Sequence, residues 1–515
     1  MQIHTQIKRI ASNYIRMVIT FLCGIWLLRL LLQFGDGVYA AVALTGSSIG
    51  IAEILKEMIR GATIPILGTS YHKLDKSEFK HVFSSTALLS IVAAIFSALI
   101  LSLFILFIGH FNIAENLEKA TIFYISTRII YVFIAISASP ILNMLPITDR
   151  MISYNIWLTI ERSGEVISAL AVTYLIATNS DADELIQFSI LSASFMTVIV
   201  CLATAYTTRL NNQFFPKFKH ASLERIKSIS KTIGWNGAAV VSVNLYLRFD
   251  LLLINLFYGV QATVIFGLAS QLAAYTRILT MGLITGLDAV VTQNSSLNKT
   301  EFNVNTIELS KNILRLQTLV LGFAVLVIVF HSTQIIELLF SSQVKNSTVI
   351  PSIVLSFQIL MIGMLARSLS EGWMSILAGS GKIKEYAIPV FYGSLLNPVI
   401  VIIIVSLISE TAGLTLIAIT FLTLNVVFHM GVVPVIMARE FKTTMSNILS
   451  PLVIPVTLTI TGVILILVIN RYFDFSSGLS QFATTLIIAS LCIAPYTLYS
   501  FIRLLRANIL GPTKI

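Results

Sequence analysis

The chain has 515 residues, of which 56% are hydrophobic and only 11% are charged, and its mean hydropathy is +0.89. These values exclude an ordinary soluble domain and are typical of a protein that crosses a membrane many times. The formal net charge is +10, but the positions of the basic residues attribute it to membrane topology, so we expect no nucleic-acid partner.

Fourteen apolar stretches follow one another along the chain, and most match the roughly 20 residues that an α-helix needs to cross the hydrocarbon core. The first is too long for the core of a signal peptide, so we expect it to remain as a span. The sequence therefore predicts an all-α polytopic membrane protein. The predicted spans are 10–33, 38–67, 82–108, 120–145, 152–176, 185–206, 233–257, 262–291, 316–330, 349–377, 386–408, 414–436, 452–469 and 482–501.

The basic residues of the loops lie almost entirely on one side of the membrane. Of the 34 lysines and arginines, nine fall inside predicted spans, 22 fall in loops on one side and three in loops on the other. Because cytoplasmic loops carry the excess of lysine and arginine, both termini are expected in the cytoplasm.

The longest polar connection follows the sixth span and divides the chain into two halves. Asn13 lies 22 residues before Gly35 and Asn236 lies 23 residues before Gly259, which indicates a weak repeat between the first spans of the halves. Two repeated lobes are expected of an alternating-access transporter. We predict an N-terminal six-helix lobe (1–207), a cytoplasmic linker (208–231), a C-terminal six-helix lobe (232–440) and two extra helices with a cytoplasmic tail (441–515).

Sixteen Asp, Glu, Lys and Arg side chains lie inside the predicted spans, with cations in excess. Since a charge at the bilayer centre costs about 3 kcal/mol, sixteen facing lipid would outweigh the net stability of ~5–15 kcal/mol of a typical protein. They must face a polar interior, and a net positive interior suits an anionic cargo. The cations are Arg16, Arg29, Lys56, Arg60, Arg128, Arg162, Arg248, Arg277 and Arg367, and the anions are Glu53, Glu57, Glu161, Glu165, Asp250, Asp288 and Glu371.

The second span carries a ladder of four charges on one helical face, because Glu53, Lys56, Glu57 and Arg60 follow i, i+3, i+4, i+7 spacing. One interpretation is a static set of ion pairs that joins this helix to a neighbour. The other is that the ladder lines the transport cavity, because four charges exceed what helix association needs.

Other charges are spaced so that they share helical faces. In the fifth span Glu161, Arg162 and Glu165 follow Asn155, and their partners stay open. Arg277 and Asp288 lie about three turns apart, Arg367 and Glu371 lie one turn apart and could pair with each other, and Asn244 lies one turn before Arg248.

Arginine suits an anionic cargo because its planar guanidinium group can bind two phosphate oxygens at once and keeps its charge when desolvated. A diphosphate is the natural complement, with structural ion pairing as the alternative role of each cation. The substrate-binding candidates are Arg60, Arg248, Arg277, Arg29, Arg128, Arg162, Arg367, Lys56 and Asn244. The carboxylates that could couple transport to an ion, or act only as counter-ions, are Glu53, Glu57, Glu161, Glu165, Asp288 and Glu371.

No motif for catalysis, cofactor binding or metal binding emerges. The fragment Gly379-Ser380-Gly381-Lys382 resembles a phosphate-binding loop, but Ile376 and Ile383 replace the first glycine and the Ser or Thr that such a loop requires. We expect it to end the tenth helix at a turn. The seven histidines lie mostly in loops and at span ends and form no metal cluster, so we expect neither an enzyme nor a cofactor.

Three segments, LLLQFG at 30–35, RFDLLLINLFYG at 248–259 and ILAGSGKIK at 376–384, resemble those of the polysaccharide flippases of the multidrug/oligosaccharidyl-lipid/polysaccharide exporter superfamily. The order of six, six and two spans is similar to that family over essentially the whole chain. The resemblance implies a Wzx-type flippase for O-antigen or exopolysaccharide repeat units.

Such a protein is expected to move an undecaprenyl-diphosphate-linked oligosaccharide across a bacterial inner membrane, by alternating access through a cationic central cavity. The resemblance also implies contacts with membrane lipids and with the polysaccharide polymerase and chain-length machinery. Two alternatives stay open. One is a lipid II flippase of the same superfamily, which residues 60–67 faintly resemble, and the other is a multidrug antiporter, which typically has twelve spans and cationic cargo.

Overall fold

The computed structural model describes residues 2–72, 76–176, 180–211, 214–284, 287, 291, 299–341, 349–472 and 478–506. Every regular element within these ranges is helical. The chain forms two compact units, which we call the N-terminal unit (Lys8–Gly267 with Phe391–Leu414) and the C-terminal unit (Leu268–Val390 and Thr415–Ile515, with Met1–Ile7). The all-α polytopic architecture predicted from the sequence is therefore confirmed.

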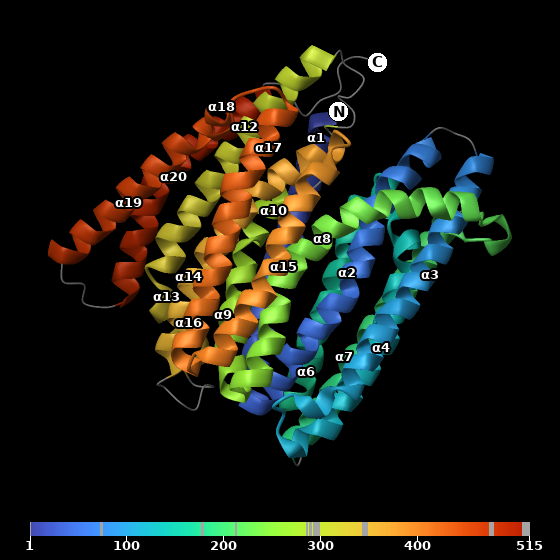
Figure 1. Ribbon diagram of the computed structural model, residues 1–515, viewed down its shortest axis with the longest axis horizontal. Coiled ribbons are helices and arrows are strands. Elements are labelled where there is room, and N and C mark those ends of the chain that lie inside the picture. Colours follow the sequence, from blue (N-terminus) through green and yellow to red (C-terminus); the bar gives the residue numbers. More distant parts are fainter. Residues whose placement is uncertain are drawn as a thin grey trace. The chain divides into compact units, whose positions relative to one another are not determined.

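The first part of the chain, up to Thr276, consists mainly of long helices (Figure 1). Their bounds are α1 Gln2–Phe34, α2 Asp36–His72, α3 Lys76–Leu106, η1 Ile108–His110, α4 Glu115–Leu142, α5 Met144–Ile147, α6 Met151–Tyr174, α7 Asp181–Leu210, η3 Phe218–His220, α8 Leu223–Tyr258 and α9 Val260–Thr276.

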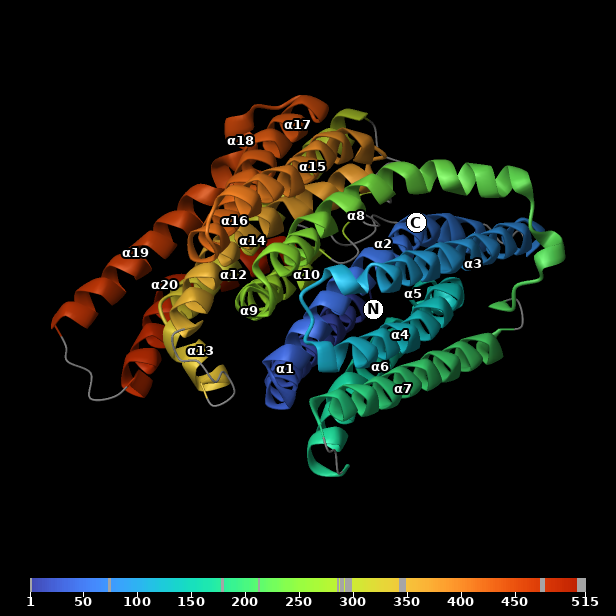
Figure 2. The same cartoon turned by 60° about the horizontal axis from the view of Figure 1, so that its bottom comes forward.

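The rest of the chain continues the same pattern, with α19 and α20 packed as a pair in the C-terminal unit (Figure 2). Bounds here are α10 Ile278–Ile284, α12 Lys299–Ala324, the π-helix η5 Val325–Val329, α13 Ser332–Phe340, α14 Ile350–Gly379, α15 Ile383–Leu407, α16 Glu410–Asn425, the π-helix η7 Val426–Val432, α17 Val433–Glu440, α18 Met445–Leu449, η8 Ser450–Leu452, α19 Val453–Tyr472 and α20 Gly478–Arg506.

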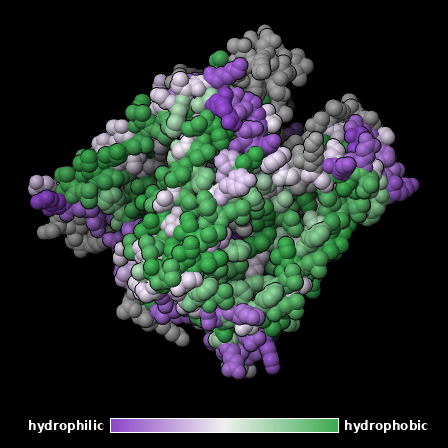
Figure 3. Space-filling model, viewed as in Figure 1, coloured by the Kyte–Doolittle hydropathy of each residue, from purple (hydrophilic) through white to green (hydrophobic). Residues whose placement is uncertain are grey.

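Twelve helices in the described ranges are long and apolar enough to cross a membrane, against the fourteen spans predicted. The two predicted spans outside this set, 152–176 and 233–257, still correspond to single helices, α6 and α8. The helix α6 is not counted among the twelve because it carries too many charged residues for an apolar span: Glu161, Arg162 and Glu165 lie within its 24 residues. On the face shown in Figure 3, apolar side chains cover the middle of the helices and hydrophilic ones gather near the helix ends.

In each half of the predicted repeat, a glycine forms the turn between two consecutive helices. Gly35 separates α1 from α2 with φ +129°, and Gly259 separates α8 from α9 with φ +88°. Residues with a side chain rarely adopt such values, whereas glycine does so at little cost. The Gly259 N–H also donates to the carbonyls of Ile254 and Asn255, so it ends α8 in the manner of a helix C-cap.

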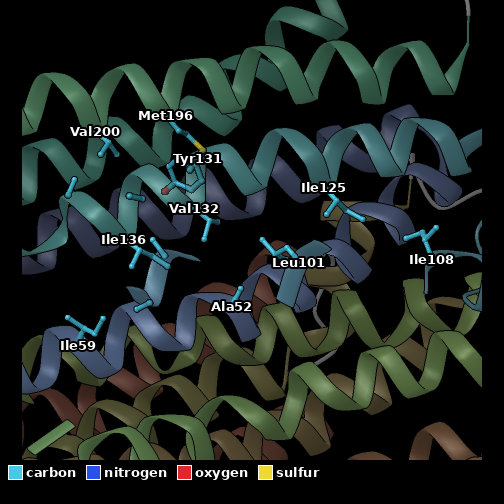
Figure 4. Close-up of a cluster of buried hydrophobic side chains, with 14 residues drawn as sticks. Ala52, Ile59, Leu101, Ile108, Ile125, Tyr131, Val132, Ile136, Met196 and Val200 are labelled. Carbon is cyan, nitrogen blue, oxygen red and sulfur yellow. The ribbon is translucent and has the colours of Figure 1, made fainter. Parts of the chain in front are cut away.

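The core of the N-terminal unit is an apolar cluster where α2, α3, α4 and α7 pack together (Figure 4). Ala52 and Ile59 come from α2, Leu101 from α3, Ile125 from α4 and Val200 from α7, and each is almost fully buried. In the C-terminal unit α12, α19 and α20 enclose a second cluster that includes Leu319, Leu326 and Ile466. These packed helices hold the buried polar side chains in place.

Candidate functional site

Among the described side chains of the N-terminal unit, Arg128 is a deeply buried cation, with only 2% of its side chain exposed. Its Nη2 lies 3.2 Å from Glu165 Oε1 on α6 and donates to Ser192 Oγ on α7 at 3.1 Å. The guanidinium also lies over the ring of Tyr124, 4.9 Å from its centroid. Arg128 therefore joins α4, α6 and α7 through one buried ion pair and its hydrogen bonds.

The acids of α6 both have partners in this network. Glu165 Oε2 also accepts a hydrogen bond from Nη1 of Arg162 at 3.2 Å, and the Arg162 side chain is 56% exposed. Glu161, which is buried, accepts a hydrogen bond from the Tyr131 hydroxyl. The structure thus places both predicted coupling acids of the fifth span in contacts within their own unit.

Arg248 lies against the backbone of α2, a contact that spacing along the sequence did not indicate. Its Nη1 donates to the carbonyl of Gly46 at 2.9 Å. The guanidinium occupies the space that a Cβ at Gly50 would fill, whereas nothing lies within 4 Å of a Cβ built at Gly46. A Gly-x-x-x-Gly pair could have suggested this close approach, because small residues allow such contact between membrane helices.

The rest of the predicted site in the N-terminal unit is only partly described. Lys56 is half-buried on α2, while Glu57 on α2 and Arg29 on α1 are exposed. The side chains of Glu53, Arg60 and Asn244 lie outside the described part of the structure, as does the whole of Asp288 in the other unit.

Asp250 is a fully buried carboxyl group that sequence reasoning counted but gave no role. Asn397 on α15 donates from Nδ2 to its Oδ1 at 2.6 Å, and also to the carbonyl of Tyr246 at 3.3 Å. The other carboxyl oxygen of Asp250 has no hydrogen-bond partner among the described residues. Asn397 was missed because a lone amide in an apolar helix carries no sequence signal of its contact.

Arg277 and Arg367 approach the same carboxylate in the C-terminal unit. The Nε of Arg277, at the break between α9 and α10, lies 2.5 Å from Glu371 Oε1, and the Nε of Arg367 lies 3.8 Å from the same oxygen. Glu371 is 2% exposed but Arg277 is 27% exposed. The pairing that spacing suggested for Arg367 and Glu371 is present, and Arg277 joins it from the break between α9 and α10.

His429 was also missed by sequence reasoning, which treated the histidines as residues of loops and span ends. It is fully buried in the π-helix η7, and its Nδ1 lies 2.5 Å from the Oγ of Ser370 on α14. Its ring centroid lies 6.3 Å from that of Tyr386 on α15. Ser370 directly precedes Glu371, so the histidine borders the Arg277–Glu371–Arg367 cluster.

The glycine-rich fragment after α14 is a turn, as expected. The helix ends at Gly379, and Gly381 has φ +73°. Lys382 is held by α17, with its Nζ 3.4 Å from Glu440 Oε2 and 4.8 Å from the centroid of the Phe441 ring. Within the described residues no group of three or more His, Cys, Asp or Glu side chains could hold a metal ion.

Comparison with known proteins identifies the fold. No family model and no curated protein matches the chain. An inward-facing multidrug resistance MATE family transporter of the MOP superfamily has a TM-score of 0.65 at 14% identity, over 85% of this chain and 99% of its own. The lipid II flippase MurJ, in an inward closed conformation, has a TM-score of 0.65 at 12% identity, over 96% of this chain and 99% of its own.

A MOP superfamily transporter from Pyrococcus furiosus, described as having a binding pocket of reverse polarity, has a TM-score of 0.64 at 14% identity, over 86% of this chain and 96% of its own. Identities this low establish the fold alone. The chain therefore has the two-lobe, all-helical transporter fold that MATE transporters and the lipid II flippase share.

Proposed function

We propose that this multi-pass membrane protein belongs to the MOP superfamily and is a flippase. It would move an undecaprenyl-diphosphate-linked oligosaccharide from the cytoplasmic to the periplasmic leaflet of a bacterial inner membrane, with both termini in the cytoplasm. In this proposal the lobes alternate access to a cationic cavity, the diphosphate binds in-span arginines and the prenyl chain stays in lipid.

The observation that carries the proposal is the excess of cations over anions within the spans of a chain that has this fold. A neutral or cationic drug would gain nothing from fixed arginines, whereas a diphosphate binds them with charge-assisted hydrogen bonds. Arg277 is the best placed of the described cations, because it is buried enough to be oriented by Glu371 and exposed enough to reach a ligand.

Coverage favours a flippase over a multidrug antiporter. The match to the lipid II flippase spans 96% of this chain, while the match to the MATE transporter spans 85%. The longer match is the reason to keep lipid II itself as the second candidate cargo. A drug antiporter would be supported only by the shared fold.

Transport in reconstituted vesicles distinguishes these cargos. Vesicles that contain the purified protein are loaded with fluorescent undecaprenyl-diphosphate oligosaccharide, with lipid II or with an organic cation, and movement is followed by quenching from outside. The proposal expects movement of the oligosaccharide lipid. Movement of lipid II alone would select the second candidate, and movement of the organic cation alone would contradict both.

A further inference from the structure

The connection between α7 and α8 exposes large apolar side chains. We call residues 214–227 the connecting segment. Phe215 is 64% exposed, Phe218 is 51% exposed and Leu223 is 82% exposed, so three such side chains lie within nine residues of one another. Single exposed apolar residues are common on protein surfaces, but a group of them indicates a surface that contacts another molecule or a membrane.

The connecting segment is held against α3 by packing and hydrogen bonds. Phe214 is only 2% exposed and belongs to an apolar cluster with residues of α2 and α3. The backbone N–H of Lys217 donates to Ser84 Oγ at 3.3 Å, and the backbone N–H of Ser222 donates to Ser85 Oγ at 3.1 Å. These contacts fix the backbone, so the exposed apolar side chains stay outside the core of the N-terminal unit.

The same surface carries a net positive charge. Among the described side chains of residues 77–80 and 214–227, five are Lys or Arg and two are acidic, and Arg225 Nη2 lies 3.5 Å from Glu78 Oε1. The pKa of His220 is lowered, first by desolvation and then by nearby positive charges, of which Lys219 has the largest effect. An anionic partner is therefore favoured. The cations are Lys80, Lys217, Lys219, Arg225 and Lys227, and the acids are Glu78 and Glu224.

The position of the connecting segment favours a membrane as that partner. Two of the helices that are long and apolar enough to cross a membrane, Ser77–Leu106 and Asp181–Leu210, have ends beside it. Figure 2 shows the connection passing from the end of α7 across the end of α3. The segment therefore lies where spans leave the hydrocarbon core and meet lipid headgroups. Aromatic side chains concentrate at that depth, and lysines there attract anionic lipids.

We propose that the connecting segment is a binding surface for the anionic headgroups of phospholipids. Phe215, Phe218 and Leu223 enter the boundary between headgroups and acyl chains, and the lysines of the segment contact lipid phosphates. A neutral headgroup would leave these cations without a counter-charge, and a soluble acidic protein would have to displace lipid to cover the apolar side chains. None of these residues is among the substrate-binding candidates, so the proposal goes beyond the proposed function and does not depend on its cargo.

The test uses the full-length protein in micelles of a neutral detergent. A polarity-sensitive fluorophore is attached at Leu223→Cys, after the native cysteines are replaced by alanine. Phosphatidylglycerol, phosphatidylcholine or soluble glycerophosphoglycerol is then added, and the emission wavelength is followed. The labelled protein is compared with its Lys217→Gln/Lys219→Gln and Lys384→Gln/Lys442→Gln variants. The last pair is the matched control, because it removes the same charge from exposed lysines of the C-terminal unit.

Phosphatidylglycerol is expected to shift the emission to shorter wavelength at a lower concentration than phosphatidylcholine does, because the probe enters a less polar environment. Loss of Lys217 and Lys219 should raise the half-maximal concentration of phosphatidylglycerol at least about 10-fold, since each lysine near an anionic lipid surface contributes roughly 5-fold. The control pair should leave it unchanged.

Equal responses to the two lipids, or an unchanged half-maximal concentration without Lys217 and Lys219, would overturn the proposal. A shift with glycerophosphoglycerol would also overturn it, because the site would then bind a soluble phosphate ester. No response to either lipid would exclude a lipid surface and leave a protein as the partner.

Discussion

The Nε of Arg277 lies 2.5 Å from Oε1 of Glu371, and the carboxylate is almost fully buried while the arginine is 27% exposed. The pair therefore joins a buried carboxyl group to an arginine side chain that is partly accessible. Removal of the cation and removal of the anion should have different effects.

Arg277→Gln is expected to weaken binding of a diphosphate lipid by about 10- to 100-fold, because one hydrogen bond to a charged group contributes about 1.5–3 kcal/mol. The measurement is equilibrium binding in detergent. The control is Arg471→Gln, at an exposed arginine near the end of α19, which should bind as wild type. Equal affinities for both variants would show that Arg277 does not hold the cargo.

Glu371→Gln is expected to destabilise the protein by about 3–5 kcal/mol, because the buried cation Arg367 would lose its counter-ion and the partly exposed Arg277 would lose its ion pair. Glu385→Gln is the control. It removes an ion pair with Arg439 that is exposed on both sides, so its effect should be at most about 1 kcal/mol. Thermal unfolding in detergent measures both, and similar melting temperatures would argue against a tightly coupled buried cluster.

Gly50→Ala is expected to lower stability, because the new Cβ would overlap the guanidinium of Arg248. Gly46→Ala on the same helix meets nothing within 4 Å and should be neutral or stabilising by roughly 0.5–1 kcal/mol. Adding Arg248→Ala should rescue Gly50→Ala in a double-mutant cycle, because the clash is then gone. Purely additive effects of the two changes would show that Arg248 does not lie on Gly50.

Membrane orientation is tested by single cysteines in a cysteine-free background. Lys219→Cys, in the polar connection after α7, should react with a membrane-impermeant maleimide only from the cytoplasmic side, because the 22-to-3 distribution of loop cations predicts that side. Glu115→Cys, at the start of α4, should react only from the other side. The reverse pattern would overturn the predicted topology.

The sequence predicted the helices well because length and hydropathy determine spans locally. The weak repeat that it predicted places Gly35 and Gly259 at corresponding positions, and in the structure both glycines separate two helices with positive φ. Most contacts between helices could not be predicted from the sequence. Spacing could propose Arg367 with Glu371, one turn apart, but nothing local indicates that Arg277 joins them.

The same limit applies to the contact of Arg248 with Gly50 and to the burial of His429 beside Ser370. Each depends on which faces of distant helices meet, and one sequence alone does not contain that information. The buried partners of Arg128 show the consequence for site prediction. A cation within a span can join helices, bind cargo, or do both, and only its surroundings distinguish these roles.

The central claim is that arginines within the spans hold a lipid-linked diphosphate during its passage across the membrane. The most direct measurement is the rate at which undecaprenyl-diphosphate oligosaccharide crosses vesicles that contain wild type, Arg60→Gln, Arg248→Gln or Arg277→Gln, with insertion verified for each. The account predicts rapid movement by wild type and slower movement by the variants. Wild-type rates in all three variants would contradict it.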